Sequence, residues 1–120
     1  MKPNGSIILD VYSLNAFLER EEQSIYAYNL LNGFWSAEKY YGFLNTFKYD
    51  IEKVVLDKYT IVEKNKIRVI YNWLQYYNRD TLTKEFEENN LQVYNFFSDV
   101  AGSKFNLNKN EMAIIAKKPT

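Results

Sequence analysis

The chain contains neither histidine nor cysteine, so acid–base or nucleophilic chemistry would fall to carboxylates, tyrosines, lysines or a borrowed cofactor. The two missing residue types are also the commonest metal ligands. Tyrosine, in contrast, occurs eleven times, and its apolar ring and polar hydroxyl suit both pockets and interfaces. A β-rich core filled with aromatic side chains is the simpler explanation of this composition, and both interpretations stay open.

Two charged side chains have positions from which they could bind a ligand. Asp10 follows an apolar run at residues 7–9, and open α/β sheets bind ligands at the carboxyl ends of their strands. Asp10 is equally suited to a turn or to capping the helix that follows. Arg68 alternates with apolar residues and could pair with an anionic group of a ligand, although a surface salt bridge with Asp57 or Glu63 is the simpler expectation.

Composition argues against several classes of protein. Fifteen basic and fifteen acidic residues give a net charge of zero, so no overall field favours nucleic acid or an anionic membrane. No apolar run approaches the ~20 residues of a membrane span. A length of 120 residues suits one domain, and the lack of cysteine fits a reducing compartment. We therefore expect a soluble, cytoplasmic, single-domain protein that binds neither nucleic acid nor membrane.

The N-terminal part of the chain is expected to form a strand and a helix. Residues 6–12 are apolar on both faces until Asp10, which is typical of a strand that is buried on both sides of a sheet. Ser13 can cap a helix that is predicted to run to about residue 23. The apolar face of this helix would be formed by Leu14, Phe17, Leu18 and Ile25.

The middle of the chain alternates in the manner of β-strands. Tyr41, Phe43, Phe47 and Tyr49 share one face of a first strand, although the pattern leaves open which face is buried. Strands at 54–63 and 66–76 follow, and Asn65 between them tolerates the left-handed backbone of a tight hairpin. Three consecutive strands with short connections predict an antiparallel meander.

The last part of the chain predicts a helix and two strands. Asn78 is a suitable N-cap, Leu82 and Phe86 lie one turn apart, and Asn89-Asn90 is a suitable left-handed stop. The strands are expected at 91–97 and 112–117. The final strand is apolar on both faces, like the first one. Strands of this kind need helices on both sides of their sheet, and the chain has too few helices to supply them.

Four stretches resemble class I S-adenosylmethionine-dependent methyltransferases. KPNGSIILDVYS is similar to the turn and fifth strand of that family, with Asn4 where a glycine is usual. YYNRDTLTKEFEENNLQVYNFFSDVAG resembles the late helix and sixth strand, and EMAIIAKKP resembles the terminal strand. The segment from FWSAEKYY through VVLDKYTIVEKNKIRVIYNWLQYY looks like the antiparallel insertion that many small-molecule members place above the substrate.

This resemblance implies an α+β fold, in which an antiparallel β-meander with flanking helices joins the strand 5-7-6 edge of a Rossmann-like methyltransferase sheet. Within one domain, residues 1–33 would form a strand and helix, 34–77 the lid insertion, and 78–120 a helix and the terminal strand pair. The glycine-rich loop and the acidic residue that hold the cofactor in the family have no counterpart here. We therefore expect the C-terminal half of a methyltransferase, with residue 1 an internal position or a truncated start.

S-adenosylmethionine is the cofactor that the resemblance implies for the full-length enzyme, with a small molecule as substrate and no catalytic residue assigned in this chain. The chain alone would be inactive. By resemblance, Asp10 would contact the substrate and Tyr12 would form a wall of the pocket. Trp73, Tyr76 and Tyr77 end the insertion, which returns over the active site in the family. Since Tyr76 and Tyr77 point to opposite faces of a strand, only one should reach a substrate, and Trp73 is expected to pack in the core.

The first strand would lack its inner neighbour in this arrangement. Its edge would then expose unpaired N–H and C=O groups, so we expect the isolated chain to form a homodimer through that edge. A protein of another class stays open as the alternative: a stand-alone α+β module that binds a small ligand in an aromatic-lined pocket or that dimerises, without catalysis.

Overall fold

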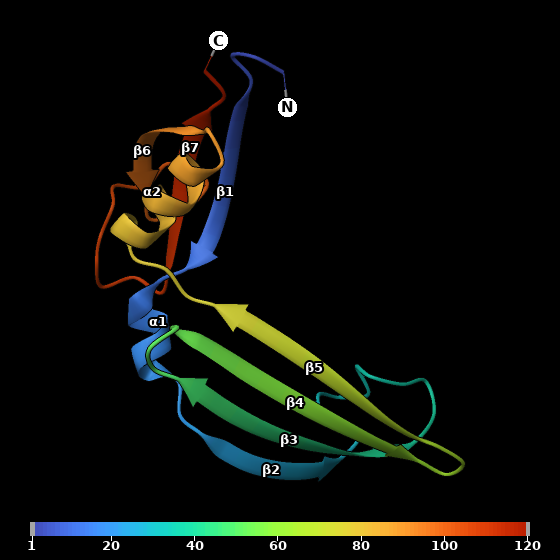
Figure 1. The fold of residues 1–120 in the computed structure, drawn as a ribbon. Helices are drawn as coiled ribbons and strands as arrows, with labels where there is room; N and C mark the ends of the chain where they lie inside the picture. Colours follow the sequence, from blue (N-terminus) through green and yellow to red (C-terminus); the bar gives the residue numbers. More distant parts are fainter. Residues whose placement is uncertain (1, 120) are drawn as a thin grey trace. The chain divides into compact units, whose positions relative to one another are not determined.

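The computed structural model describes residues 2–119 and divides into two compact units. The first unit contains the chain up to Glu19 and from Tyr76 onward, and the second contains Arg20–Gln75. Each unit has its own sheet (Figure 1). The second unit begins before the predicted lid insertion because it includes an additional strand. Among the residues described, no helix is long and apolar enough to cross a membrane.

The first unit is built on a three-stranded antiparallel sheet with the order β1-β7-β6. Its strands are β1 (Ser6–Tyr12), β6 (Gln92–Phe97) and β7 (Glu111–Lys117). The positions of these strands and their order agree with the sequence prediction. The turn before β1 is also as expected, since Asn4 has a positive φ of 62°.

β7 is buried on both faces, as predicted, whereas β1 is not. Met112, Ala113 and Ile114 are all at most 2% exposed. In β1 the exposure alternates along the strand, and Ile8 is 57% exposed. The prediction that β1 is buried on both faces is therefore wrong for this chain, because only the face that carries its odd-numbered residues packs into the hydrophobic core.

Helix α2 (Arg79–Glu88) forms as the sequence predicts. The Asn78 side chain accepts a hydrogen bond from the Thr81 amide at 2.8 Å, and the Thr81 hydroxyl accepts one from the Asn78 amide at 3.0 Å. This reciprocal cap satisfies two N–H groups at the helix start. Leu82 and Phe86 pack into a cluster with Met112, Ile114 and Ala116 of β7. Asn90, with a φ of 60°, follows the helix end.

Helix α1 (Leu14–Glu19) ends earlier than predicted, and the strand β2 (Gln23–Tyr28) begins where the helix was expected to end. Ile25, which was assigned to the helix face, lies in β2 opposite Leu44. The segment 25–28 is rich in β-branched and aromatic residues, which favour strands. Its apolar residues fit a helical period only in part, so pairing with the neighbouring strand prevails.

The second unit is a four-stranded antiparallel sheet with the order β2-β3-β4-β5. It contains β3 (Tyr40–Tyr49), β4 (Val54–Glu63) and β5 (Ile67–Gln75) in addition to β2. The predicted meander and its hairpin after Glu63 are confirmed. The hairpin is closed by the Glu63 amide, which donates to the Lys66 carbonyl at 2.9 Å. Asn65 does not adopt a left-handed backbone, so this part of the turn prediction is wrong.

One face of the four-stranded sheet is buried and the other is exposed. The buried face contains Leu44, Tyr59 and Ile61, which pack with Tyr40 and Leu30. Gly42 belongs to the same face, where a Cβ atom would lie only 2.5 Å from the Cβ of Leu30. The even-numbered residues of β3 are therefore the inner ones, and the aromatic residues at odd positions face outward.

Glu63 at the end of β4 makes the second unit sensitive to acid. Burial alone would raise the pKa of its carboxyl group, but the hydrogen bond with Ser36 and the charges of Lys66 and Arg68 together hold that pKa below the ordinary value. A carboxylate with a lowered pKa contributes stability at neutral pH that is lost as the pH falls through its folded-state value.

We expect Glu63→Gln to flatten the pH dependence of the melting temperature below the ordinary glutamate value of 4.5. The measurement is a thermal melt followed by circular dichroism from pH 7 to pH 3. The matched control is Glu88→Gln, which alters an exposed carboxylate whose oxygen lies 3.9 Å from the Lys84 ammonium group. Equal pH profiles for Glu63→Gln and the unchanged protein would contradict the role given to Glu63.

Candidate functional site

The carboxyl end of β1 carries an open hollow of about 210 Å³. Asp10 and Tyr12 lie on the same exposed face of the strand, two residues apart. Glu111, the first residue of β7, pairs with Tyr12 across the ladder and also lines the hollow. Two carboxylates and one tyrosine ring therefore surround a space that is open to a ligand.

Tyr76 supports this hollow from inside the protein. Its side chain is 3% exposed, its ring centroid lies 5.6 Å from that of Tyr12, and a second contact of 5.6 Å joins it edge-on to Phe17. The substrate contact predicted for Tyr76 stays a prediction. These contacts show that the ring of Tyr76 packs against the ring of Tyr12.

Tyr77, which like Tyr76 lies beyond the end of β5, contacts other residues of the first unit. Its ring packs against the hydrophobic cluster that contains Leu82 and Met112. Burial, followed by the nearby charge of Glu85, raises the pKa of its hydroxyl above the ordinary value. Its backbone joins the end of β1, because the Tyr77 amide donates to the Tyr12 carbonyl at 3.1 Å. This hydrogen bond fixes the backbone at Tyr77 beside the end of β1.

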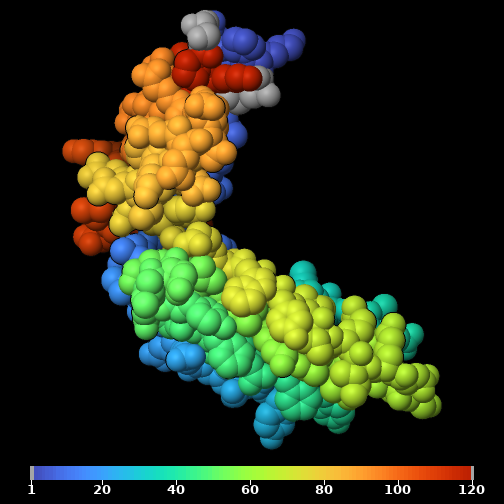
Figure 2. Space-filling model, viewed as in Figure 1, coloured from blue at the N-terminus to red at the C-terminus, as the bar shows by residue number. Residues whose placement is uncertain are grey.

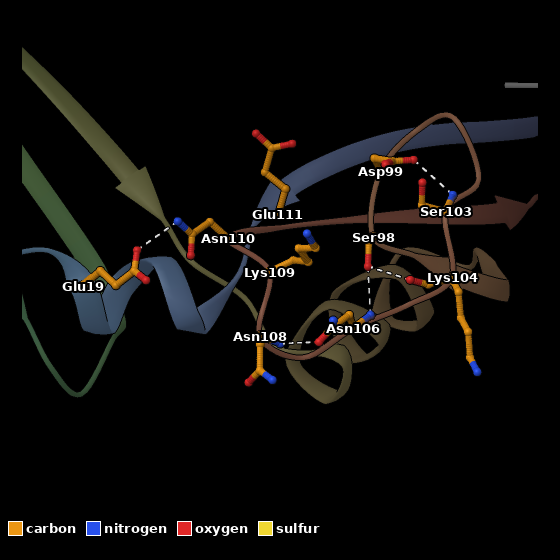
Figure 3. Close-up of a pocket in the computed structure, with 10 residues that line it drawn as sticks. All are labelled: Glu19, Ser98, Asp99, Ser103, Lys104, Asn106, Asn108, Lys109, Asn110 and Glu111. Carbon is orange, nitrogen blue, oxygen red and sulfur yellow. Dashed lines mark hydrogen bonds between the residues drawn. The ribbon is translucent and has the colours of Figure 1, made fainter.

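A second, more polar hollow of about 590 Å³ lies next to the loop between β6 and β7 (Figure 3). Its polar side chains mostly shape the loop itself. The Ser98 hydroxyl donates to the Lys104 carbonyl at 2.9 Å and accepts from the Asn106 amide at 2.8 Å. The Ser103 hydrogen bonds lower the pKa of Asp99. Since these groups satisfy one another, they hold the loop in shape and leave few of them for a ligand.

Glu111 lines both hollows and was not singled out from the sequence. In Figure 3 its side chain points to the opposite side of the chain from Asn108. Only the antiparallel register brings it opposite Tyr12. The available signal was its position as the first residue of an apolar strand, which identifies a strand end but not its partner.

The two remaining candidate residues lie in the second unit. Trp73 is 58% exposed and its ring makes a tilted contact with Tyr49, with the ring centroids 5.9 Å apart. The expectation that it packs in the core is therefore wrong. Arg68 donates to the Trp35 carbonyl at 2.6 Å and forms an ion pair with Glu63 at 3.2 Å. Of the two salt-bridge partners foreseen for Arg68, the structure selects Glu63, because Asp57 is paired with Arg20 at 2.6 Å.

The described residues offer no cradle for a nucleotide-like cofactor. Such a cradle needs a glycine-rich turn between a strand and the start of a helix. Gly42 lies in the middle of β3, and Gly33 and Gly102 lie in loops that no helix follows. The helices α1 and α2 instead follow Ser13 and Asn78. Within residues 2–119, no three acidic side chains are arranged to hold a metal ion.

Fold comparison defines the class to which this architecture is similar: part of an S-adenosylmethionine-dependent methyltransferase. The whole chain superposes on 46% of the CcbJ methyltransferase from Streptomyces caelestis, with a TM-score of 0.63 and 11% sequence identity. Likewise, 99% of the chain superposes on 46% of an S-adenosylmethionine-dependent methyltransferase from Clostridium acetobutylicum ATCC 824, with a TM-score of 0.64 and 11% identity.

The chain thus spans a little less than half the length of each of these two structures. At 11% identity the likeness shows a shared fold and nothing about activity. No protein-family model and no curated protein sequence matches the chain.

Proposed function

We propose that this chain is the substrate-side, C-terminal portion of an S-adenosylmethionine-dependent methyltransferase that acts on a small molecule. The observation that carries this proposal is the superposition of 99–100% of the chain on 46% of each of two methyltransferases, one of them described as S-adenosylmethionine-dependent. The strand order β1-β7-β6 adds support, because the resemblance in the sequence implies that order for the edge of the methyltransferase sheet.

The exposed edge of β1 supports the same proposal. On the β7 side, the Gly5 carbonyl accepts a hydrogen bond from the Lys118 amide and the Ser13 amide donates one to the Asn110 carbonyl. Such bonds alternate in direction along an antiparallel pair. The N–H and C=O groups of Ser6, Ile8 and Asp10 therefore point outward, where no strand pairs with β1 within the described part of the chain. A further strand of a larger sheet fits this edge. The pairing of a second copy at this edge of the isolated chain stays a prediction.

The hollow at the end of β1 is suited to hold a methyl acceptor. Methyl transfer is an in-line displacement that depends mainly on the positions of the reacting atoms. The cofactor supplies the methyl group on its sulfonium, and in this proposal another part of the protein holds it. The carboxylates of Asp10 and Glu111 can accept hydrogen bonds from an amine or hydroxyl of the acceptor. The ring of Tyr12 gives the hollow an apolar wall.

The proposed function is tested by determining the coding DNA upstream of Met1 over roughly 400 bases, since 120 residues correspond to 46% of the compared chain. The expected result is an open reading frame that encodes an apolar strand, a glycine-rich turn and a helix, which together bind the cofactor. A stop codon and a ribosome-binding sequence directly before Met1 would overturn the proposal. The stand-alone ligand-binding or dimerisation module would then take its place.

A further inference from the structure

The outward face of the four-stranded sheet in the second unit is an unusual surface. The strand registers place eighteen side chains on it, of which only Lys58 is charged. Eight of the eighteen are aromatic, and they come from three of the four strands. The aromatic face consists of Tyr26, Tyr28, Tyr41, Phe43, Phe47, Tyr49, Tyr71 and Trp73.

These aromatic rings are exposed to solvent and already ordered. Each of the eight is between 38% and 75% exposed. Tyr26 stacks on Phe43 with ring centroids 5.9 Å apart, and the rings of Tyr28 and Tyr41 meet edge-on at 5.4 Å. Ordered rings lose little conformational freedom when they are covered. In Figure 2 the side chains of β3, β4 and β5 (green to yellow) lie uncovered on the side of this unit that faces the viewer.

The size of the aromatic face matches the requirement of a protein interface. Each aromatic side chain can bury 150–250 Å², so eight half-exposed rings offer roughly 800 Å². This equals the area of about 800 Å² that each partner contributes to a standard interface. Monomers rarely expose an apolar patch larger than about 300–600 Å². The exposed apolar area of the aromatic face is therefore larger than that of the apolar patches that monomers usually expose.

The shape and charge of the face favour a second copy of this chain as the occupant. A sheet face packs well against another sheet face, with side chains interdigitating over about 10 Å. Two copies related by a two-fold axis bring the same patch together. Lys58 is the single charged residue of the face, so the face has no charge pattern that would select an acidic or basic partner. In the dimer the Lys58 ammonium group can lie over a tyrosine ring.

We infer that this chain forms a two-fold homodimer in which the aromatic faces of the two four-stranded sheets pack against each other. This interface is distinct from the β1 edge, and the inference does not depend on the proposed methyltransferase function. It makes the second unit of each copy the dimerisation element of the protein.

The test is sedimentation velocity of the full chain between about 1 and 100 μM, combined with two matched variants. The unchanged protein is expected to be a dimer. Tyr41→Glu places a charge in the aromatic face opposite Tyr28 and Val62, which are uncharged. It should weaken dimerisation at least about 100-fold, since the carboxylate would be buried without a partner. Ile51→Glu places the same charge on a residue that is 92% exposed and outside the face, and it should leave the dimer intact.

A third variant separates this interface from the β1 edge. Ile8→Pro removes an N–H group that points outward from β1, which blocks strand addition at that edge without breaking the ladder with β7. It should leave the dimer intact. A dimer lost in Ile8→Pro and kept in Tyr41→Glu would overturn the inference, as would an unchanged protein that is monomeric at 100 μM. Circular dichroism confirms that each variant is folded.

Fluorescence gives a second readout, which needs no substitution in the aromatic face. In Trp35→Phe the only remaining tryptophan is Trp73, which is 58% exposed. Its emission should shift to shorter wavelength as the concentration rises through the dissociation constant, because dimerisation removes water from the indole ring. An emission maximum that does not change with concentration, while sedimentation shows a dimer, would place the interface elsewhere and overturn the inference.

Discussion

Replacing Tyr76 with alanine is expected to lower the free energy of unfolding by about 3–5 kcal/mol, the range for removal of a buried aromatic ring. The ring is 3% exposed and contacts both Tyr12 and Phe17. Its loss leaves a cavity directly beneath the hollow at the end of β1. The ring of Tyr12 then loses the ring that it packs against. We expect the wall of the candidate site to become disordered and the core to be weakened.

Urea denaturation followed by circular dichroism measures this loss of stability, and two matched variants serve as controls. Tyr76→Phe keeps the ring contacts and should cost no more than about 1.5 kcal/mol, the contribution of one hydrogen bond. Tyr28→Ala removes a ring that is 50% exposed and should cost clearly less than Tyr76→Ala. Similar losses for Tyr28→Ala and Tyr76→Ala would contradict the supporting role of Tyr76.

Replacing Arg20 with alanine is expected to destabilise the second unit by about 2–3 kcal/mol. Asp57 is 6% exposed, and one of its oxygens accepts hydrogen bonds from the Arg20 guanidinium at 2.6 Å and the Thr46 hydroxyl at 2.7 Å. Removing one partner of a buried ion pair leaves an uncompensated charge, which costs about 3–5 kcal/mol when both groups are fully buried. The side chain of Arg20 is 29% exposed, so the expected loss is smaller.

A double-mutant cycle with Asp57→Asn checks this expectation. If the cost comes from the unpaired carboxylate, Arg20→Ala should cost much less in the Asp57→Asn background. Lys84→Ala is the control, because it removes a partner of an exposed ion pair and should cost at most about 0.5 kcal/mol. Equal costs of Arg20→Ala in the two backgrounds would mean that the pair contributes little to the stability of this unit.

The elements that the sequence predicts well are those whose signals are local. The cap at Asn78, the one-turn spacing of Leu82 and Phe86 and the stop at Asn89-Asn90 specify α2 without reference to the rest of the chain. The last strand is likewise recognisable because it is apolar on both faces. The alternation of tyrosine and phenylalanine in 41–49 identifies a strand and its two faces.

The features that the sequence misses depend on the neighbours of each element. The exposure of the aromatic residues of β3 reflects which face Leu30 covers, and Leu30 is a loop residue with no signal of its own. The strand β2 is stabilised by pairing with β3, so its formation is a tertiary effect that overrides the assignment of Ile25 to the helix face. β1 is apolar on both faces, yet the described chain covers only one of them.

The candidate site shows the same division. Asp10 and Tyr12 could be found from the sequence because they end an apolar run, and they do lie together at one hollow. Glu111 could not be found, because it is a hundred residues away and only the ladder register brings it there. Trp73 was linked to the site by resemblance and Arg68 by its alternation with apolar residues, and no contact within their own unit tests either assignment.

The way in which the second unit interrupts the first has an evolutionary consequence. The chain leaves the first unit after Glu19 and re-enters it at Tyr76. Both points belong to neighbouring parts of the first unit, since the rings of Phe17 and Tyr76 are in contact and Ser13 forms a bridge with Tyr77. Insertions are tolerated best where both ends of the inserted segment meet. The segment 20–75 can therefore be exchanged, lengthened or lost by recombination while β1, α2 and β7 keep their core. Selection can thus change this segment without having to rebuild the sheet of the first unit.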